Sequence, residues 1–143
     1  MEAFQAEKDL VLDFFRELEQ CSPADCRKVL NSYVSDVYCW EAVYPFLEQH
    51  TAEYAAEVFW KPFKEAMSHL QRRQDVFIAG KAMEDDRHWV MSMGQFMGLF
   101  DYEFLGIRPT GKMQHLQYIE FNCVENGKIV QTEPKRPKHR YKI

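Results

Sequence analysis

The segment GLFDYEFLGIRPTGK, residues 98–112, separates two stretches in which apolar residues recur at a spacing of about two. Its first half is crowded with large apolar side chains, whereas its second half contains Gly106, Pro109 and Gly111. Glycine permits backbone angles that other residues resist, and proline fixes the path of the chain between the two glycines. The segment therefore predicts a tightly specified turn between two strands.

Strands are predicted on both sides of this turn because the apolar period changes from 3.6 towards 2 after Arg73. The predicted strands are Val76 to Ala79, Trp89 to Met97, Met113 to Val124 and Lys128 to Thr132. The last two are joined by Glu125-Asn126-Gly127, a hairpin turn, since Asn-Gly readily takes positive φ. An earlier strand is predicted from Val37 to Val43, which is rich in β-forming residues and ends just before Pro45.

Three amphipathic helices are predicted in the first half of the chain. Apolar residues recur at helical spacing from Asp9 to Leu18, and Ser22 followed by Pro23 begins a second, short helix. Thr51 can cap a third helix, which Pro62 should break or kink because proline lacks the amide hydrogen and clashes one turn back. The apolar stripe of the third helix resumes at Phe63, Met67 and Leu70.

Helices followed by consecutive antiparallel strands specify an α+β fold in which the helices cover one face of the sheet. With 143 residues, we expect one domain over residues 1–133 and a basic tail over residues 134–143 that is dispensable for folding. The tail contains no acidic residue and five cations: Lys135, Arg136, Lys138, Arg140 and Lys142.

The composition argues against several classes of function. The net charge is −4 although the tail is basic, so the folded body is acidic, and we expect it not to bind nucleic acid. No apolar run approaches the roughly 20 residues that span a bilayer, and no charged leader opens the chain. Four cysteines lack paired CxxC spacing and five histidines form no HxH or HExxH motif. We therefore expect a cytoplasmic protein with reduced thiols and no metal site.

Two linked motifs carry a family resemblance. GLFDYEFLGIRPTGK at residues 98–112 and IEFNCVENGKIVQ at residues 119–131 resemble the SnoaL-like polyketide cyclase branch of the nuclear transport factor 2-like superfamily. WEAVYPF from Trp40 and FWKPFKEAM from Phe59 are similar to a subgroup described as polyketide or ester cyclases.

The resemblance implies a cone-shaped α+β barrel, with N-terminal helices packed on a strongly curved, mainly antiparallel sheet. It also implies a homodimer packed through sheet faces and a cavity for a small hydrophobic or polycyclic carbonyl compound, with no cofactor. In such a fold the turn at residues 98–112 lies at the sheet rim, and we expect Phe104 and Leu105 to point inward.

The acid/base residue is the central question for such an activity, because ring closure by aldol condensation needs a base beside a carbonyl and a donor for its oxygen. The family's aspartate, about seven residues after the glycine of its G-K-I motif, falls on Pro134 when counted from Gly127. Glu133 is one residue away, which would turn its side chain to the opposite face. A family histidine seven residues before that glycine falls on Glu120, so the resemblance makes Glu120 the principal acid/base candidate.

Further site residues follow from this assignment. Tyr118 and Asn122 share the strand parity of Glu120 and could donate hydrogen bonds to a carbonyl or enolate oxygen, although both also suit structural roles. The candidates for substrate binding are mostly large apolar residues of the predicted pocket wall, each also suited to an ordinary core: Trp40, Tyr44, His50, Trp60, Trp89, Met93 and Met97.

The sequence thus predicts a cofactor-independent cyclase or isomerase that acts on a small carbonyl compound. The alternatives are a catalytically silent ligand-binding module of the same fold and a protein-interaction module that uses its sheet face or basic tail.

Overall fold

The computed structural model describes residues 3–134, so the basic tail predicted over residues 134–143 lies outside the described part except for Pro134. Its elements, in chain order, are α1 (Gln5–Gln20), the short 3-10 helix η1 (Pro23–Asp25), α2 (Cys26–Tyr33), β1 (Val34–Trp40), α3 (Ala52–Tyr54), the π-helical segment η2 (Ala55–Trp60), α4 (Lys61–Ala66), β2 (Met67–Lys81), β3 (His88–Phe100), β4 (Met113–Glu125) and β5 (Lys128–Glu133). The predicted α+β class is confirmed.

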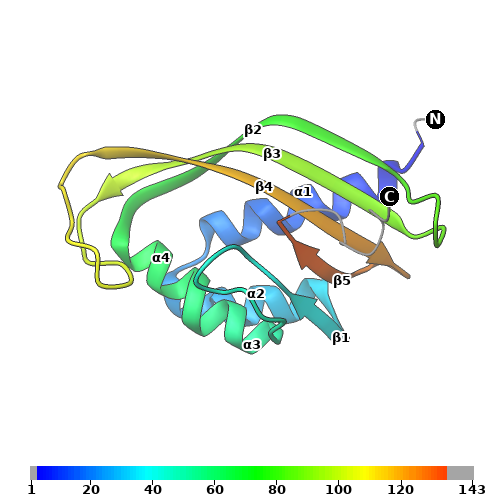
Figure 1. Ribbon diagram of the computed structural model, residues 1–143, viewed down its shortest axis with the longest axis horizontal. Helices are drawn as coiled ribbons and strands as arrows, with labels where there is room; N and C mark the ends of the chain where they lie inside the picture. Colours follow the sequence, from blue (N-terminus) through cyan, green and yellow to red (C-terminus); the bar gives the residue numbers. More distant parts are fainter. Residues whose placement is uncertain (1–2, 135–143) are drawn as a thin grey trace.

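The five strands form one sheet in the order β1-β5-β4-β3-β2. All neighbours pair antiparallel except β1 and β5, which run parallel. β1 lies at one edge of the sheet, beside the last strand. Parallel partners need a long connection, and the chain from α3 to β4 supplies it. Figure 1 shows the long strands β2, β3 and β4 arching over the helices, so the sheet is strongly curved and its inner face is the one towards the helices.

The helical predictions are confirmed through α4, where Phe63 is buried as predicted, and fail from Met67 onward. In α1 the buried residues are those of the predicted stripe, Val11, Phe14, Phe15 and Leu18. Before Pro62 the chain widens into a π-helical turn, where the Lys61 amide bonds to the Ala56 carbonyl, five residues back. Met67 does not continue the helix as predicted, because it takes extended angles and begins β2.

β2 is much longer than the four residues predicted. Two irregularities interrupt the alternation of its side chains, between Ser68 and Gln71 and between Gln74 and Val76, so the sequence pattern revealed only part of the strand. At the second, the chain folds tightly against Gly94 of β3. A Cβ atom on Gly94 would lie 1.8 Å from the Arg73 carbonyl oxygen. Only glycine fits there, and the sheet bends where its inner face lacks a side chain.

The turn at residues 98–112 connects β3 and β4 as predicted. Leu105, Gly106 and Gly111 have positive φ angles of 52°, 79° and 68°, which the glycines adopt without strain. Phe104 points inward and packs 5.5 Å from the Phe63 ring. The inward position predicted for Leu105 is wrong, since its side chain is 48% exposed.

The outer face of the sheet is only partly covered. A small cluster of Ala82, Trp89, Cys123 and Val130 is buried there, and large apolar side chains remain exposed beside it: Ile78, Met93, Met113 and Ile119.

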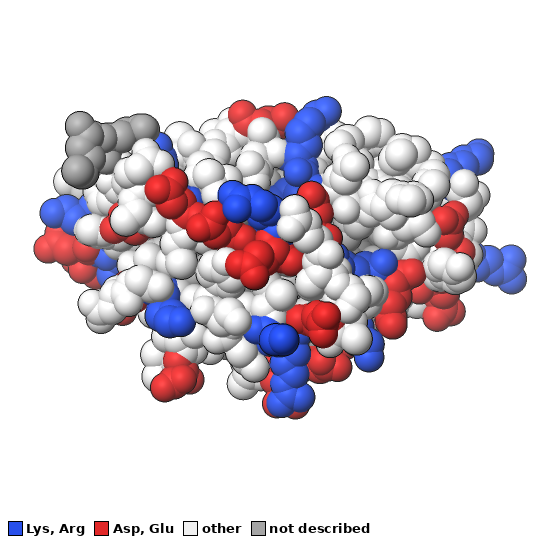
Figure 2. Space-filling model, turned by 180° about the vertical axis from the view of Figure 1, so that it is seen from behind, with Lys and Arg blue, Asp and Glu red and all other residues white. Residues whose placement is uncertain are grey.

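Seen from behind, acidic and basic side chains are interspersed with uncharged surface rather than gathered by sign (Figure 2). Over residues 3–134, no helix is both long and apolar enough to cross a bilayer.

Candidate functional site

A cavity of about 740 Å³ opens between the inner face of the sheet, the helices and the connection that follows β1. Its wall combines a set of aromatic residues with polar and charged ones. The aromatic residues include Trp40, Phe59, Trp60, Phe63, Phe96 and Phe104, and the polar ones include Glu41, Asp75, Gln95, Gln117 and Glu133. Ligand pockets in proteins typically enclose about 300–1,000 Å³ and combine an apolar wall with a few convergent polar groups. The cavity has this character, since Tyr118, Glu120 and Thr132 also line it.

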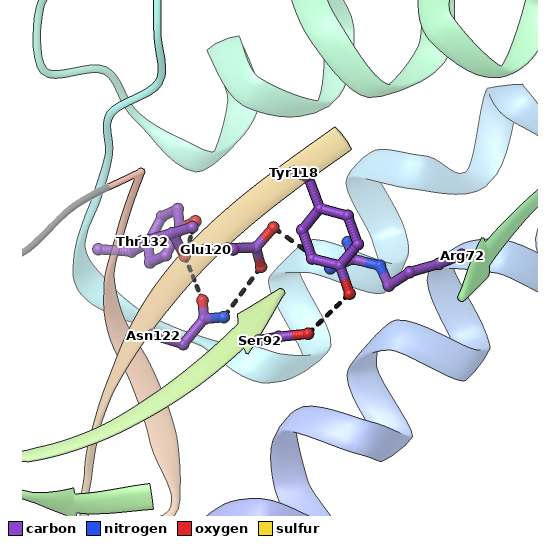
Figure 3. A network of polar contacts seen from close by, with 7 residues as sticks. Arg72, Ser92, Tyr118, Glu120, Asn122 and Thr132 are labelled. Carbon is purple, nitrogen blue, oxygen red and sulfur yellow. Dashed lines mark hydrogen bonds and ion pairs between the residues drawn. The ribbon is translucent and has the colours of Figure 1, made fainter. Parts of the chain in front are cut away.

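A chain of hydrogen bonds ends on the Glu120 carboxylate (Figure 3). The Tyr38 hydroxyl donates to Thr132 Oγ1 over 2.6 Å, and Thr132 donates to Asn122 Oδ1 over 2.6 Å. Asn122 Nδ2 then donates to Glu120 Oε2 over 2.9 Å. From the other side, Arg72 Nη1 lies 3.4 Å from Glu120 Oε1. Both carboxylate oxygens therefore accept from fixed donors, as an ionised carboxylate requires.

The Arg72 guanidinium is sandwiched among aromatic rings. Its central carbon lies 3.6 Å from the Phe15 ring centre, 4.7 Å from that of Phe96 and 4.8 Å from that of Tyr118. The Arg72 side chain is only 4% exposed. Cation–π contacts and one carboxylate thus replace water around the Arg72 guanidinium. The ion pair with Arg72 in turn fixes the position of the Glu120 carboxylate at the cavity.

Tyr118 carries the second polar group of the site. Its hydroxyl oxygen lies 2.7 Å from Ser92 Oγ on β3. Directly across from Tyr118 in the strand register is Gly94, and the missing side chain leaves the Tyr118 ring room to lie over β3 towards Arg72 (Figure 3).

The strand register explains why these groups meet. Tyr118, Glu120 and Asn122 alternate with outward residues along β4 and lie on the inner face. Asn122 is paired with Thr132 of β5 and with Val90 of β3. The three residues predicted as catalytic therefore share one face beside the cavity, and Tyr118 and Glu120 line it.

The predicted substrate-binding residues fall into two groups. Trp40, Trp60 and Met93 line the cavity. The side chain of Met93 belongs to the outer face, because Met93 is paired with Ile119 of that face and is 40% exposed.

The remaining four lie outside the cavity lining. Trp89 and Met97 belong to the outer face of β3, and Trp89 is buried in the small outer cluster. Alternation divides a strand's side chains into two sets but does not identify the covered set. Tyr44 is 81% exposed, and the His50 ring stacks on the Tyr54 ring with 3.6 Å between the ring centres.

The position of the family's usual aspartate is filled by Pro134, which borders the cavity. Glu133 is paired with Phe121, whereas Thr132 is paired with Asn122, so the two neighbours belong to opposite faces. The Glu133 carboxylate accepts a hydrogen bond from Gln131 and is buried. Glu133 also lines the cavity, so this end of β5 brings a carboxylate to the cavity wall one residue before the usual aspartate position.

Sequence reasoning missed four members of the polar network: Tyr38, Arg72, Ser92 and Thr132. The sequence did not identify Arg72 because the irregularities of β2 disturb the alternation of inward and outward side chains along the strand. Tyr38 is 8% exposed, and burial raises the pKa of its hydroxyl, so it remains a donor to Thr132. In residues 3–134 no group of three or more His, Cys, Asp or Glu side chains could hold a metal ion.

Comparisons with known proteins identify the fold. No protein-family model matches the chain, and no curated protein matches it. Among solved structures, a candidate SnoaL-like polyketide cyclase from Jannaschia sp. CCS1 is 18% identical, with a TM-score of 0.68, over 93% of this chain and 87% of that one. A candidate hydroxylase from Streptomyces galilaeus is 17% identical, with a TM-score of 0.67, over 90% of this chain and 77% of that one.

A nuclear transport factor 2-like protein from Burkholderia thailandensis is 17% identical, with a TM-score of 0.61, over 88% of this chain and 86% of that one. The chain therefore has the nuclear transport factor 2-like fold that SnoaL-like polyketide cyclases share. At these identities the likeness is one of fold, and fold alone does not fix the reaction.

Proposed function

We propose that the protein binds a small apolar carbonyl compound in the cavity and catalyses acid/base chemistry at the carbon beside the carbonyl, without a cofactor. The observation that carries this proposal is the Glu120 carboxylate on an aromatic-lined cavity with the Tyr118 hydroxyl two residues away on the same face. A base and a hydrogen-bond donor on the wall of one cavity are what enolisation requires.

In this mechanism Glu120 removes a proton from the carbon beside the carbonyl, and the electrons of that C–H bond move to the carbonyl oxygen. Tyr118 donates a hydrogen bond to the resulting enolate oxygen. Each carboxylate oxygen keeps a second lone pair beyond the one used by Asn122 or Arg72, so Glu120 can accept the proton. Attack of the enolate carbon on a second carbonyl of the same molecule closes a ring, and the proton passes to the new alkoxide. Return of the proton to another carbon gives isomerisation instead.

The likeness to a candidate polyketide cyclase supports this reaction class by fold analogy. The alternative is a binding module that uses the same cavity without catalysis. Pro134 at the usual aspartate position and the two donors already on Glu120 favour this alternative.

The exposed apolar residues on the outer face of the sheet support a homodimer as the assembled form. Ile78, Met93, Met113 and Ile119 are all at least 40% exposed, and a second copy packed there would remove them from water.

The cysteines support a reducing compartment, as in the cytoplasm. All four are free, and burial raises the pKa of Cys26 to about 12 and that of Cys123 to about 11. Both thiols are therefore protonated and suited to packing rather than to disulfide exchange.

The test uses α-tetralone, an apolar bicyclic ketone, in heavy water. An enolising enzyme exchanges the protons beside the carbonyl for deuterium faster than buffer does, which proton NMR follows directly. The proposal expects saturable, protein-dependent exchange. Binding of the ketone with exchange no faster than in buffer would overturn catalysis of this class and leave the binding module.

A further inference from the structure

Ser92 is a buried hydroxyl at the edge of the proposed site. Its side chain is 0% exposed and it faces Glu120 across the β3–β4 pair. Within residues 3–134, the Tyr118 hydroxyl oxygen, 2.7 Å away, is the one hydrogen-bond partner of Ser92 Oγ. The direction of this bond decides what Tyr118 can do for a ligand.

The two directions are not equivalent. If Tyr118 donates, the Ser92 proton is left in a fully buried position without an acceptor among the described residues. A buried donor without an acceptor costs about 1–3 kcal/mol of desolvation. If Ser92 donates, its proton is satisfied and the unused proton is that of Tyr118. Tyr118 is only partly buried and lines the cavity, so a ligand can satisfy that proton.

The neighbours of Tyr118 support the second direction. The Arg72 guanidinium, 4.8 Å from the ring centre, is a donor group with no acceptor to offer. The carboxylate of Glu120 already accepts from Asn122 and Arg72. If Ser92 donates, the Tyr118 proton is thus an uncommitted donor on a residue that lines the cavity.

We propose that Ser92 is a positioning residue: it donates to the Tyr118 oxygen and thereby commits the Tyr118 proton to a carbonyl oxygen of the bound ligand. This inference rests on the proposed function for its ligand class, an apolar compound with an acceptor oxygen. Because hydrogen bonds in a chain polarise one another, the Ser92 donor also strengthens the bond from Tyr118 to the ligand. The site therefore prefers a ketone over a hydrocarbon of the same shape.

The experiment compares α-tetralone with tetralin, its hydrocarbon analogue, through quenching of tryptophan fluorescence, since Trp40 and Trp60 line the cavity. In the wild-type protein we expect the ketone to bind about tenfold more tightly than the hydrocarbon, the value of one hydrogen bond. Tyr118→Phe should bring that ratio close to one. Ser92→Ala should lower it by up to about twofold and leave the affinity for tetralin unchanged.

A spectroscopic readout separates positioning from packing. With α-tetralone isotope-labelled at the carbonyl, the C=O stretch of the bound ketone should fall below its value in hydrocarbon solvent. It should return to that value in Tyr118→Phe and move part of the way in Ser92→Ala. Ser32→Ala, at an exposed serine of α2, is the matched control and should change neither measurement.

Each outcome decides a different point. If Ser92→Ala keeps the wild-type ketone-to-hydrocarbon affinity ratio and carbonyl frequency, Ser92 is not a positioning residue. If Tyr118→Phe keeps both, Tyr118 is not the hydrogen-bond donor to the ketone. A hydrogen-bonded ketone that shows no proton exchange would contradict the proposed catalysis and leave this inference standing. Failure of both probes to bind would overturn the inference together with the ligand site.

Discussion

Arg72 and Glu120 approach within 3.4 Å across the inner face of the sheet, from strands β2 and β4, which lie on either side of β3. Their side chains are 4% and 13% exposed. A pair this far from water is a coupled unit, because removing either partner leaves the other without its counter-charge. The pair joins two strands of the curved sheet, and one of its members is the proposed catalytic base.

Replacing the cation should therefore destabilise the fold. Arg72→Met keeps an unbranched apolar stem but removes the charge. Among the described residues it leaves Glu120 with the Asn122 donor, and it removes the guanidinium contact with Phe15. We expect a loss of about 3 kcal/mol in the free energy of unfolding, measured in urea. Arg16→Met is the control: its pair with Asp13 is a surface pair with Arg16 60% exposed, and it should cost less than about 1 kcal/mol. Equal losses in the two variants would mean that Arg72 contributes no more than a surface charge.

The close approach of β2 to Gly94 gives a second prediction. In Gly94→Ala the new methyl group would meet the Arg73 carbonyl oxygen at 1.8 Å, so the irregularity of β2 must move. We expect a loss of more than about 3 kcal/mol, in the upper range of single substitutions. Gly80→Ala has open space around the new atom and should be nearly neutral. If both variants unfold at the same urea concentration as the wild type, β2 does not pack against Gly94.

A pH dependence is expected at the start of α1, where Glu7 lies 2.7 Å from His88 Nδ1. The hydrogen bond to His88 lowers the pKa of Glu7 below its ordinary value of 4.5. A lowered folded pKa contributes stability above the unfolded pKa, and this is lost as the pH falls through the folded value. Glu7→Gln should therefore be less stable than the wild type at pH 6, and the difference should shrink below about pH 4. A difference that stays constant down to pH 2.5 would assign it to packing.

The outer face predicts self-association. Sedimentation of the wild type at tens of micromolar should give a dimer, because Ile119 and Met93 pair there and are both exposed in one chain. Ile119→Lys should give a monomer with unchanged secondary structure. Met83→Lys, at a 95% exposed site in the β2–β3 turn, should remain dimeric. A monomeric wild type would contradict this use of the face.

Much of the fold could be predicted from the sequence because periodicity and turn residues act locally. The stripe from Val11 to Leu18 and the positive φ of Gly106 follow from side-chain spacing and backbone freedom. The parallel pairing of β1 with β5 is a long-range relationship that no local pattern reports.

The site was predicted less completely for the same reason. The shared parity of Tyr118, Glu120 and Asn122 is a local property of one strand, and it placed them on one face. Arg72 lies between the two irregularities of β2 and meets Glu120 across β3, a relationship that local alternation does not report. Trp89 was assigned to the cavity because alternation cannot distinguish the inner face from the outer one.

The proposed reaction requires Glu120 to take up and release the proton, and Glu120→Gln removes that ability. The amide keeps the shape of the side chain and one acceptor oxygen but cannot take up a proton at neutral pH. The measurement is deuterium exchange beside the carbonyl of α-tetralone, per folded molecule, with the melting temperature taken on the same preparation. We predict exchange at least about 100-fold slower than in the wild type, with the ketone still bound. Exchange at the wild-type rate in a folded, ketone-binding variant would contradict the account and leave Glu120 as the structural partner of Arg72.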